Sequence, residues 1–485
     1  NLLASSGRYI WVSTNFSSST FARYRVVLEA APSVLDANDI NFTFRNGPFR
    51  YFINDTNSVG DVYCNQLGND ANTGSSSNAP KATLANLLSS ADLEPGDVVY
   101  IDSGHYLLAS SPQITSADSG SSTQLVQYIG SPVLGRTVFN RQGGSGTDGL
   151  LISGAPFVEI CNILFTNAAV GVRVESSQGV RLTRLAARNL TDSGYVIRNS
   201  PNAQISESYV TGVSSNGVLV ETSTGVVLRS SVIYGAPVSG VRVLSGRLAI
   251  SNSSVSAVSS DSLAFWVATP TNLVGNFNNY NALSGAFIGY AASLDEYYDT
   301  LSAWRSRSGS EAASLSVDPQ FANAADADFH LKTQTPAGRY DPGTATWVSD
   351  PVTSLLIDSG DPASPYASEP SPNGNRVNIG QYGNSAEASI GRTTPWLYAA
   401  SFQAGGAARG VAVFRWVAGN LATDATVRVE YSTDGGLAYV TLSTGILASV
   451  GQVSFDTATT SDTPSAVWRV TSTTDPGLTD ATTNF

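Results

Sequence analysis

The sequence predicts an all-β protein in which a parallel β-helix is flanked by β-sandwich modules, and three observations lead to that fold. Residues 394–485 alternate apolar and polar side chains between turn signals. The two ends of the chain resemble each other at a constant offset of 444 residues. Glycines recur every 23 residues, each ahead of alternating apolar residues: Gly171, Gly194, Gly217 and Gly240.

The glycine repeat predicts a solenoid, because a fixed period carried by a strand lays each turn on the turn before. Gly149 and Ser262 extend the repeat by 22 residues at either end, which gives at least six coils. Side chains alternate across a strand, so the pattern assigns an inward and an outward column. The expected inward column is Val172, Val174, Tyr195, Ile197, Val218, Val220, Val241, Val243, Leu263 and Phe265. The expected outward column is Arg173, Val196, Leu219, Arg242 and Ala264.

A second strand is expected in phase in each coil. It carries Ile160, Leu182, Ile205 and Leu228, with Leu164, Ala186, Tyr209 and Val232 four residues later. The turns between are rich in Asn, Ser, Gly and Thr, which supply left-handed backbone and local hydrogen bonds. Coils of 21 to 23 residues with two or three short strands predict a parallel β-helix. Neighbouring coils should lie about 4.8 Å apart.

Residues 394–485 predict an antiparallel β-sandwich. Strands are expected over 410–417, 425–432, 438–443, 452–456 and 466–472. Ser432-Thr-Asp-Gly-Gly is a hairpin signal between two of them. With the preceding Val427-Arg-Val-Glu-Tyr, the stretch resembles immunoglobulin-like and fibronectin-like modules.

The match between the two ends predicts a larger repeat. Leu2–Gly7 matches Ile446–Gly451, Tyr24-Arg-Val matches Trp468-Arg-Val, Pro32 matches Pro476, Asp36-Ala matches Asp480-Ala, and Asn41-Phe matches Asn484-Phe485 after a one-residue slip. Residues 1–56 are therefore expected to be the C-terminal part of a sandwich module. The whole would be one unit of about 444 residues plus an overlap, from a parent chain with several units. The missing half of the first sandwich would come from upstream chain or from another subunit.

Motifs around the first coil carry a family resemblance. They are Gly68-Asn-Asp-Ala-Asn-Thr-Gly, Pro80-Lys-Ala-Thr-Leu and Pro95-Gly-Asp-Val-Val-Tyr-Ile. The stretch 82–89 is expected to form a helix over the open end of that coil, since solenoid ends need covers. Further motifs follow later: Leu301-Ser-Ala-Trp, Asp328-Phe-His-Leu, Ile357-Asp-Ser-Gly and Asn378-Ile-Gly-Gln-Tyr-Gly.

Across residues 60–388 the chain resembles right-handed parallel β-helix proteins of the pectate-lyase superfamily. The resemblance implies a β-helix over 57–390 with an N-terminal cap and closing coils. Together with the sandwich modules, the whole is similar to repeats of very large bacterial surface proteins.

Composition limits the classes of binding partner and the cellular location that the sequence predicts. The formal net charge is −12, and only Lys81 and Lys332 are lysines. An acidic surface without basic clusters argues against nucleic acid and anionic lipid. No apolar run approaches about 18 residues, so no membrane insertion is expected. Abundant Ser, Thr, Asn, Gly and Val without Met is typical of extracellular β proteins, which predicts an extracellular or cell-surface location. Cys64 and Cys161 are expected to be separate buried thiols, with one disulfide as the alternative.

The motifs of lyases and hydrolases on this fold do not carry over. The lyases of the superfamily use a basic residue beside calcium-binding carboxylates, whereas Arg173 and Arg242 are expected three coils apart, about 14 Å. Hydrolases need two carboxylates within about 5–10 Å. The acids of the regular coils are Glu159, Glu175, Asp192, Glu207, Glu221 and Asp261. Only Glu175 and Glu221 share a phase, two coils apart. No catalytic, cofactor-binding or metal residue is therefore assigned, and enzymatic activity stays undecided.

Other polar and aromatic groups have a structural and a functional interpretation. His105 and His330 are interpreted as structural. Five aspartates in the closing stretch cap turns or bind calcium: Asp318, Asp326, Asp328, Asp358 and Asp361. Seven aromatic residues either pack the closing stretch or stack on sugars: Phe265, Trp266, Tyr280, Tyr290, Tyr297, Tyr298 and Trp304.

The leading hypothesis is a structural unit of a long extracellular surface or fibre protein, serving as stalk, sheath or adhesin. Its partners would be other copies of the same unit, and surface glycans are a further candidate. The alternatives are a carbohydrate-active lyase or hydrolase and a glycan-binding module without turnover.

Overall fold

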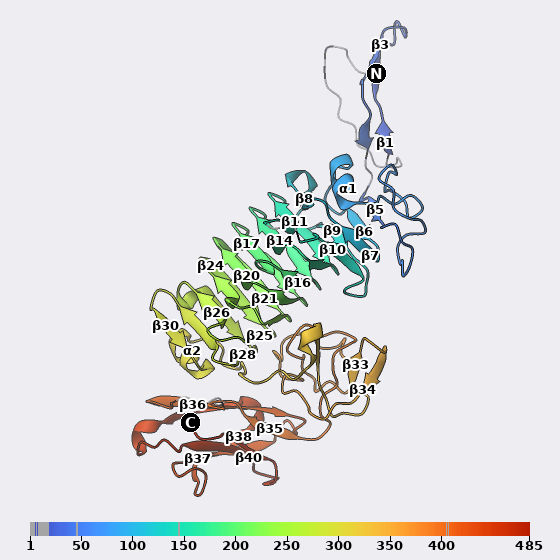
Figure 1. Ribbon diagram of the computed structural model, residues 1–485. Coiled ribbons are helices and arrows are strands. Elements are labelled where there is room, and N and C mark those ends of the chain that lie inside the picture. Colours follow the sequence, from blue (N-terminus) through green and yellow to red (C-terminus); the bar gives the residue numbers. More distant parts are fainter. Residues whose placement is uncertain are drawn as a thin grey trace.

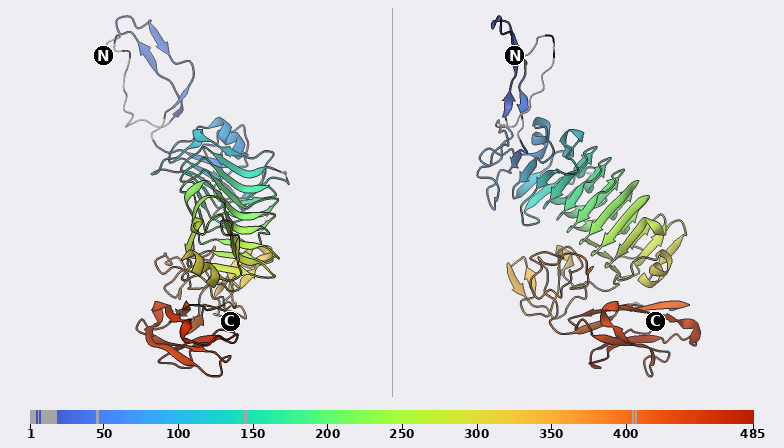
Figure 2. Two further views of the ribbon diagram at one scale, coloured as in Figure 1. Left: turned by 90° about the vertical axis from the view of Figure 1, so that its left-hand side faces the viewer. Right: turned by 180° about the vertical axis from the view of Figure 1, so that it is seen from behind.

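The structure is a computed structural model that describes residues 5, 7, 19–44, 47–143, 146–403, 405 and 407–485. Two hairpins project from the N-terminal end of a solenoid, and an antiparallel sandwich lies at its other end (Figure 1). Residues 309–392 form a separate lobe beside the solenoid, between its last coils and the sandwich (Figures 1 and 2).

Three parallel sheets make the walls of the solenoid. Sheet I contains β5 (Arg50–Ile53), β6 (Val98–Ile101), β9 (Val126–Ile129), β12 (Val158–Cys161), β15 (Arg181–Thr183), β18 (Gln204–Ser206), β21 (Ser223–Arg229), β24 (Gly246–Ser251) and β27 (Leu273–Asn276). Sheet II contains β7 (Gly104–Leu107), β10 (Thr137–Asn140), β13 (Leu164–Thr166), β16 (Ala186–Leu190), β19 (Tyr209–Val213), β22 (Val232–Tyr234), β25 (Ser254–Ala257) and β28 (Asn279–Ala282). Sheet III contains β8 (Gln113–Ile114), β11 (Asp148–Ser153), β14 (Val170–Glu175), β17 (Tyr195–Arg198), β20 (Asn216–Glu221), β23 (Ser239–Val243), β26 (Leu263–Val267) and β29 (Phe287–Ala291), with β30 (Glu296–Tyr298) added antiparallel.

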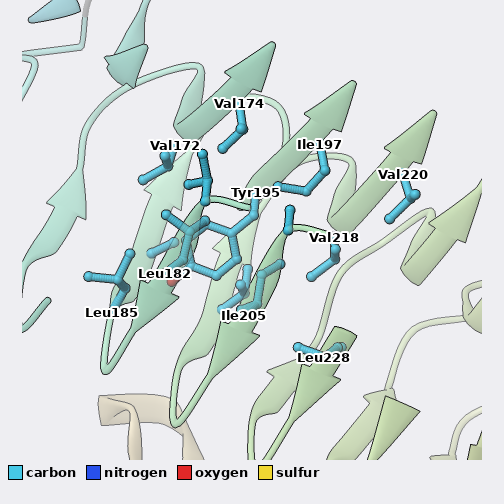
Figure 3. Close-up of a cluster of buried hydrophobic side chains, with 14 of the residues drawn as sticks. Val172, Val174, Leu182, Leu185, Tyr195, Ile197, Ile205, Val218, Val220 and Leu228 are labelled. Carbon is cyan, nitrogen blue, oxygen red and sulfur yellow. The ribbon is translucent and has the colours of Figure 1, made fainter. Parts of the chain in front are cut away.

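The predicted register of sheet III is confirmed from β11 to β23. Val172 pairs with Tyr195, Tyr195 with Val218, and Val218 with Val241. These side chains are fully buried in the solenoid core, where each rests on its equivalent in the next coil (Figure 3).

The prediction for the following coil is wrong by two residues. Val241 pairs with Phe265 and Arg242 with Trp266, so Ala264 takes the glycine position and is buried instead of facing outward. The cause is the turn before β26, which is two residues longer than the repeat predicts. Ser262, expected to open the strand, instead closes that turn, because its hydroxyl donates to the Ser259 carbonyl.

The repeated glycines are required by a close approach between coils. A Cβ atom on Gly171, Gly194, Gly217 or Gly240 would lie 2.5–2.8 Å from a carbonyl oxygen of the next coil. At Gly217 it would also lie 2.2 Å from Ile233 Cγ2 of sheet II. These positions are therefore glycine for lack of space.

The second predicted strand corresponds to sheet I, and its apolar column is buried inside the solenoid in the expected register: Ile160, Leu182, Ile205 and Leu228. The residues four positions later are also in register, but they belong to sheet II: Leu164, Ala186, Tyr209 and Val232. They face outward and are buried in a second core beneath the lobe of residues 309–392.

Buried serines link the coils at two corners. At the first corner, the Ser177 and Ser200 amides donate to the hydroxyl oxygens of Ser200 and Ser223, at 3.0 and 2.9 Å. At the second, Leu185 N donates to Ser208 Oγ at 3.0 Å, and the chain of bonds continues through Ser231. The hydroxyls of Ser177, Ser200, Ser208 and Ser231 donate to carbonyls of their own coils. Each of these serines therefore forms hydrogen bonds both to a neighbouring coil and within its own coil.

Helices cover both ends of the solenoid. The predicted helix at 82–89 is α1 (Leu84–Ser90), capped by the Thr83 hydroxyl, with Leu84 and Leu87 buried on the first coil. At the other end lies α2 (Leu301–Ser308), whose Trp304 ring packs 4.5 Å from Phe265. No described helix is long and apolar enough to cross a membrane.

The expected closing coils do not form. The bridge between Asn279 and Leu315 is the last parallel contact among the described residues. Two antiparallel hairpins follow, β31 (Phe321–Asn323) with β32 (Asp328–Leu331) and β33 (Arg339–Asp341) with β34 (Thr346–Val348). Parallel coils need long crossovers, and these tight hairpins turn the chain back instead. The segment packs on sheet II, with Phe329 5.3 Å from Tyr209.

The C-terminal region is built from two antiparallel sheets. One contains β35 (Trp396–Ala399), β36 (Val411–Gly419) and β39 (Gln452–Asp456). The other contains β37 (Thr426–Ser432), β38 (Val440–Leu447), β40 (Val467–Ser472) and β41 (Thr479–Ala481). All five predicted strands are present, and β35 and β41 are additional.

The N-terminal region consists of β1 (Ser19–Ala22) paired with β4 (Phe42–Phe44) and β2 (Arg25–Val27) paired with β3 (Leu35–Ala37). The predicted match at Leu2–Gly7 falls mostly outside the described residues. Cys64 and Cys161 are free, as predicted; Cys64 is buried, whereas Cys161 is only partly so.

Candidate functional site

The outward face of sheet III carries a column of paired charges, and it is the first candidate site. Arg173 binds Asp148 through two bonds, at 2.9 and 3.1 Å. Arg198 bonds to Glu175 at 3.2 Å and to Glu221 at 2.7 Å. These pairs join neighbouring coils, since each partner lies one coil away.

The two acids that share a phase, Glu175 and Glu221, are thus separated by Arg198. A general acid must transfer a proton to the substrate, and a nucleophile must form a bond with it. Two carboxylates held by one guanidinium between them are not arranged for that role. Arg173, expected on the outward face, pairs there with Asp148, and this pairing helps to raise the pKa of Arg173 against the lowering effect of burial.

Aromatic rings continue this column toward the end of the solenoid. The Arg242 guanidinium carbon lies 4.6 Å above the Trp266 ring, and Trp266 lies 6.2 Å from Tyr290. Tyr290 in turn lies 4.5 Å from Tyr297, which is 57% exposed. Both ring pairs are tilted, with interplanar angles of 38° and 45°, and the group is open to solvent at Tyr297.

The other predicted aromatics lie inside the solenoid. Phe265, Tyr280, Tyr298 and Trp304 are buried at its last coil, with Phe265 against Tyr280 and Trp304. The packing interpretation therefore holds for these four. The sugar-stacking interpretation remains only for the Trp266, Tyr290 and Tyr297 group.

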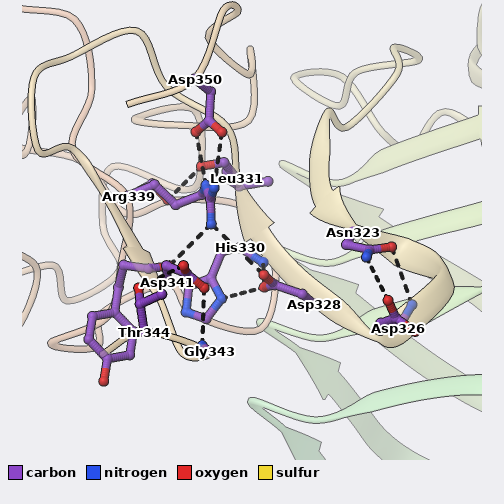
Figure 4. Close-up of polar contacts among 12 residues, drawn as sticks. Asn323, Asp326, Asp328, His330, Leu331, Arg339, Asp341, Gly343, Thr344 and Asp350 are labelled. Carbon is purple, nitrogen blue, oxygen red and sulfur yellow. Dashed lines mark hydrogen bonds and ion pairs between the residues drawn. The ribbon is translucent and has the colours of Figure 1, made fainter. Parts of the chain in front are cut away.

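A histidine cluster joins the two hairpins of the fold-back segment, which is the lobe of residues 309–392 (Figure 4). His330 is 1% exposed, and its Nδ1 lies 2.6 Å from Asp328 Oδ1. Its Nε2 lies 3.6 Å from Glu387 Oε2, and its ring stacks 3.7 Å from Tyr382. Burial lowers the pKa of His330, but the two carboxylates outweigh burial and raise it above its ordinary value.

The same cluster contains an arginine that the sequence did not single out. Arg339 binds Asp350 through two bonds, at 2.9 and 3.0 Å, and approaches Asp328 to 3.9 Å. Because His330 is enclosed, it can join the hairpins but offers no face to a substrate. The structural interpretation of His330 agrees with this geometry.

Two buried acids, Asp358 and Glu369, form a third candidate site. Burial raises the pKa of Asp358 and of Glu369 to about 7 each. Asn378 connects them. Its side-chain Oδ1 accepts from the backbone amide of Asp358, and its backbone amide donates to Glu369 Oε1. One oxygen of each acid, Asp358 Oδ1 and Glu369 Oε2, has no hydrogen-bond partner among the described residues.

Space decides what this acid pair can do. The cavity beside Asp358 has a volume of about 10 Å³ and is lined by Arg392 and Trp396. A cavity of this size holds at most a single water. Gly391 closes over the carboxylate, since a Cβ there would lie 2.0 Å from Asp358 Oδ2. No sugar ring can reach the pair. Sequence reasoning named Asp358 but missed Glu369, whose only signal is a lone acid within a Pro-rich loop.

The other aspartates of the expected calcium group are dispersed into local contacts. Asp318 accepts from Gln320, Asp326 from Asn323, and Asp361 from Ala363. Among the described residues, no group of three or more His, Cys, Asp and Glu is positioned to hold a metal ion.

A larger hollow of about 540 Å³ lies where the fold-back segment meets the sandwich. Asp318, Arg392, Tyr398 and Asp480 line it. Burial raises the pKa of Asp480, which also accepts from the Ala399 amide at 2.8 Å. This hydrogen bond joins β41 to β35, so Asp480 has a structural role.

Comparison with known proteins agrees with the fold. A family model described as "Right handed beta helix region" matches residues 117–277. No curated protein matches the chain. A lacto-N-biosidase of family GH136 from Eubacterium ramulus is similar over 50% of this chain and 56% of its own, with a TM-score of 0.37 and 12% identity.

Two lyases are similar at the same level. An alginate lyase from Paenibacillus sp. matches 42% of this chain and 91% of its own, with a TM-score of 0.27 and 15% identity. A rhamnogalacturonan lyase matches 51% and 64%, with a TM-score of 0.31 and 15% identity. The family model and the three parallel sheets show the fold: the chain is an all-β protein built on a right-handed parallel β-helix.

Proposed function

We propose that this chain is a structural spacer, one unit of about 444 residues in a tandem array on an extracellular surface or fibre protein. One observation carries the proposal: the outward charges of β11, β14, β17 and β20 and the buried corner serines are bonded to the adjacent coil. These polar groups therefore hold the stack in register along its length.

The same arrangement argues against turnover at the described sites. Glu175 and Glu221 share Arg198, His330 lies between two carboxylates, and the acid pair of Asp358 and Glu369 is enclosed. Catalysis by proton transfer needs a group that reaches substrate at hydrogen-bond distance. The acids and the histidine of these three sites are engaged or enclosed.

The spacer role predicts a rod whose length grows with each unit. Sheet I stacks nine strands, which span about 40 Å at about 4.8 Å a step. A protein of two tandem units should appear in electron micrographs as a particle about twice as long as one unit. Two units folded back side by side would contradict the proposal.

A turnover screen separates this role from the enzymatic alternative. The protein should release neither reducing ends nor unsaturated sugars from acidic or neutral polysaccharides. Release that disappears in Glu175→Gln or Glu221→Gln, but persists in the exposed control Asp299→Asn, would assign an enzyme instead.

Glycan binding without turnover is the second candidate, favoured by the exposure of Tyr297 beside Tyr290 and Phe287. On a glycan array, binding that is lost in Tyr297→Ala would support it. Leu437→Ala, which removes another exposed apolar side chain in the sandwich, is the control. An array without signal would leave the spacer role alone.

A further inference from the structure

The N-terminal hairpin of β2 and β3 has the same pairing as the hairpin of β40 and β41 at the other end of the chain. Arg25, Val26 and Val27 pair with Ala37, Asp36 and Leu35. Arg469, Val470 and Thr471 pair with Ala481, Asp480 and Thr479. Every one of these residues is displaced from its equivalent by 444 positions, so the two hairpins share one register.

The surrounding hydrogen bonds repeat as well. Asn38 N donates to Tyr24 O at 3.2 Å, and Thr482 N donates to Trp468 O at 3.0 Å. The backbone amide of Tyr24 donates to Asn38 Oδ1. In the same way, the backbone amide of Trp468 donates to the hydroxyl oxygen of Thr482.

The turn and the outer strands follow the same pattern. The bond from Leu28 N to Val34 O corresponds to the bond from Ser472 N to Leu478 O, both at 2.9 Å. The next strands also agree, because Ala22 pairs with Phe42 and the Phe485 amide donates to Ala466 O. This last pair reproduces the one-residue slip of the sequence match. The two regions are thus copies of one piece of a sandwich.

The copies differ in what covers them. Trp468 and Val470 are fully buried, whereas Tyr24 and Val26 are 63% and 67% exposed. In the C-terminal copy the cover is the opposite sheet and β37. Trp468 packs 5.1 Å from Phe414 of β36, and β40 pairs along its length with β37. Among the described residues, β2 pairs with β3 alone.

We infer that the N-terminal hairpins are the closing strands of a second sandwich, whose remaining part is a copy of the segment 396–444 joined ahead of them in the same polypeptide. The exposed face of β2 is then the inner face of that sandwich, and its open edge pairs with the copy of β37. The occupant is identified by this chain's own C-terminal region, which shows the same hairpin with its cover in place. In naming a tandem copy as the source, the inference rests on the proposed function.

A fusion protein tests the inference. Residues 394–444 of this chain are placed directly before residue 1 of the full chain, which restores one sandwich-sized stretch ahead of β2. Hydrogen exchange of the amides in residues 23–37 is compared between the fusion and the unfused chain. In the fusion, exchange should slow to within about tenfold of the matching β40 and β41 amides. Exchange that is equally fast in both proteins would overturn the inference.

Two variants make the result specific. Val26→Asp should abolish the protection in the fusion and leave the unfused chain unchanged, because Val26 is exposed there. Ile40→Asp is the matched control: Ile40 is 78% exposed, and its counterparts Thr483 and Asn484 are exposed as well. It should leave the protection intact. Protection that survives Val26→Asp would contradict the inference.

A second measurement does not depend on the fusion. Deleting residues 462–485 removes β40 and β41 and opens the C-terminal sandwich, which should then bind the N-terminal hairpins of another copy. Light scattering should show concentration-dependent oligomers that Val26→Asp disrupts; a monomer would count against the inference. If the intact chain already dimerises through Val26, the cover comes from a second molecule and the assignment to the same polypeptide is wrong. Sugar release by the protected fusion would refute the spacer role while leaving this interface standing.

Discussion

Replacing Asp358 with Asn should make the fold-back segment more stable at pH 8. The carboxyl is 6% exposed, and burial raises its pKa from 3.8 to about 7, against a lowering effect of Arg376. A shift of about 3 pKa units corresponds to about 4 kcal/mol between the two protonation states. This is the magnitude that ionisation of the buried acid costs the folded segment.

The sign follows from proton linkage. Between about pH 4 and pH 7 the folded state keeps a proton that the unfolded state has released, so stability falls as the pH rises through this window. Above the folded pKa the loss is complete. The amide that replaces the carboxyl carries no proton to lose, so Asp358→Asn should exceed the parent by only about 1 kcal/mol at pH 4.5 and by up to about 4 kcal/mol at pH 8.

Urea unfolding followed by tryptophan fluorescence measures this difference. Trp347 and Trp396 lie in or beside the segment, and the free energies are compared at pH 4.5 and pH 8. Asp299→Asn, on the exposed surface, is the control and should change neither value. A variant that is no more stable than the parent at pH 8 would refute the reasoning, because burial would then not penalise the charge.

Three further predictions concern the joints between coils. Gly217→Ala should cost about 3 kcal/mol in thermal unfolding, because the new Cβ would lie 2.2 Å from Ile233 Cγ2; Gly343→Ala, whose nearest neighbour lies at 3.4 Å, should cost less than about 0.5 kcal/mol. Ser208→Ala should cost about 1–3 kcal/mol in urea unfolding, since it leaves the Leu185 amide buried without an acceptor, and equal loss in the exposed control Ser260→Ala would contradict this. Arg198→Ala should cost no more than about 1 kcal/mol, because its ion pairs are partly exposed, and the loss should shrink in 1 M salt. A salt-independent loss would show that Arg198 acts by packing.

Sequence could predict the repeating part of the fold because its signals are local. The glycine column, the inward valines and the sheet I column recur at fixed spacing, and each residue needs only its equivalent one coil away. The register shift at Ala264 could not be predicted, because a turn that is two residues longer does not change the apolar pattern. It became visible only through the pairing of Arg242 with Trp266.

The rest of the fold depends on contacts between distant segments. Tyr209 has the pattern of an ordinary strand residue, and nothing near it in the sequence indicates that Phe329 covers it from outside. The acid pair is similar: Asp358 and Glu369 are brought together by Asn378 within an irregular loop, where no period assigns a face. The candidate site was therefore less predictable than the scaffold.

The apolar outer surface of sheet II constrains how this architecture can change in evolution. Leu164, Ala186, Tyr209 and Val232 are sheltered by a lobe of fixed reach. A duplicated coil would expose a further apolar patch that the lobe does not cover. A deleted coil would remove part of the surface on which the lobe packs. Coil number and lobe size can thus vary only together, so a longer molecule is reached more readily by repeating the whole unit than by lengthening the solenoid.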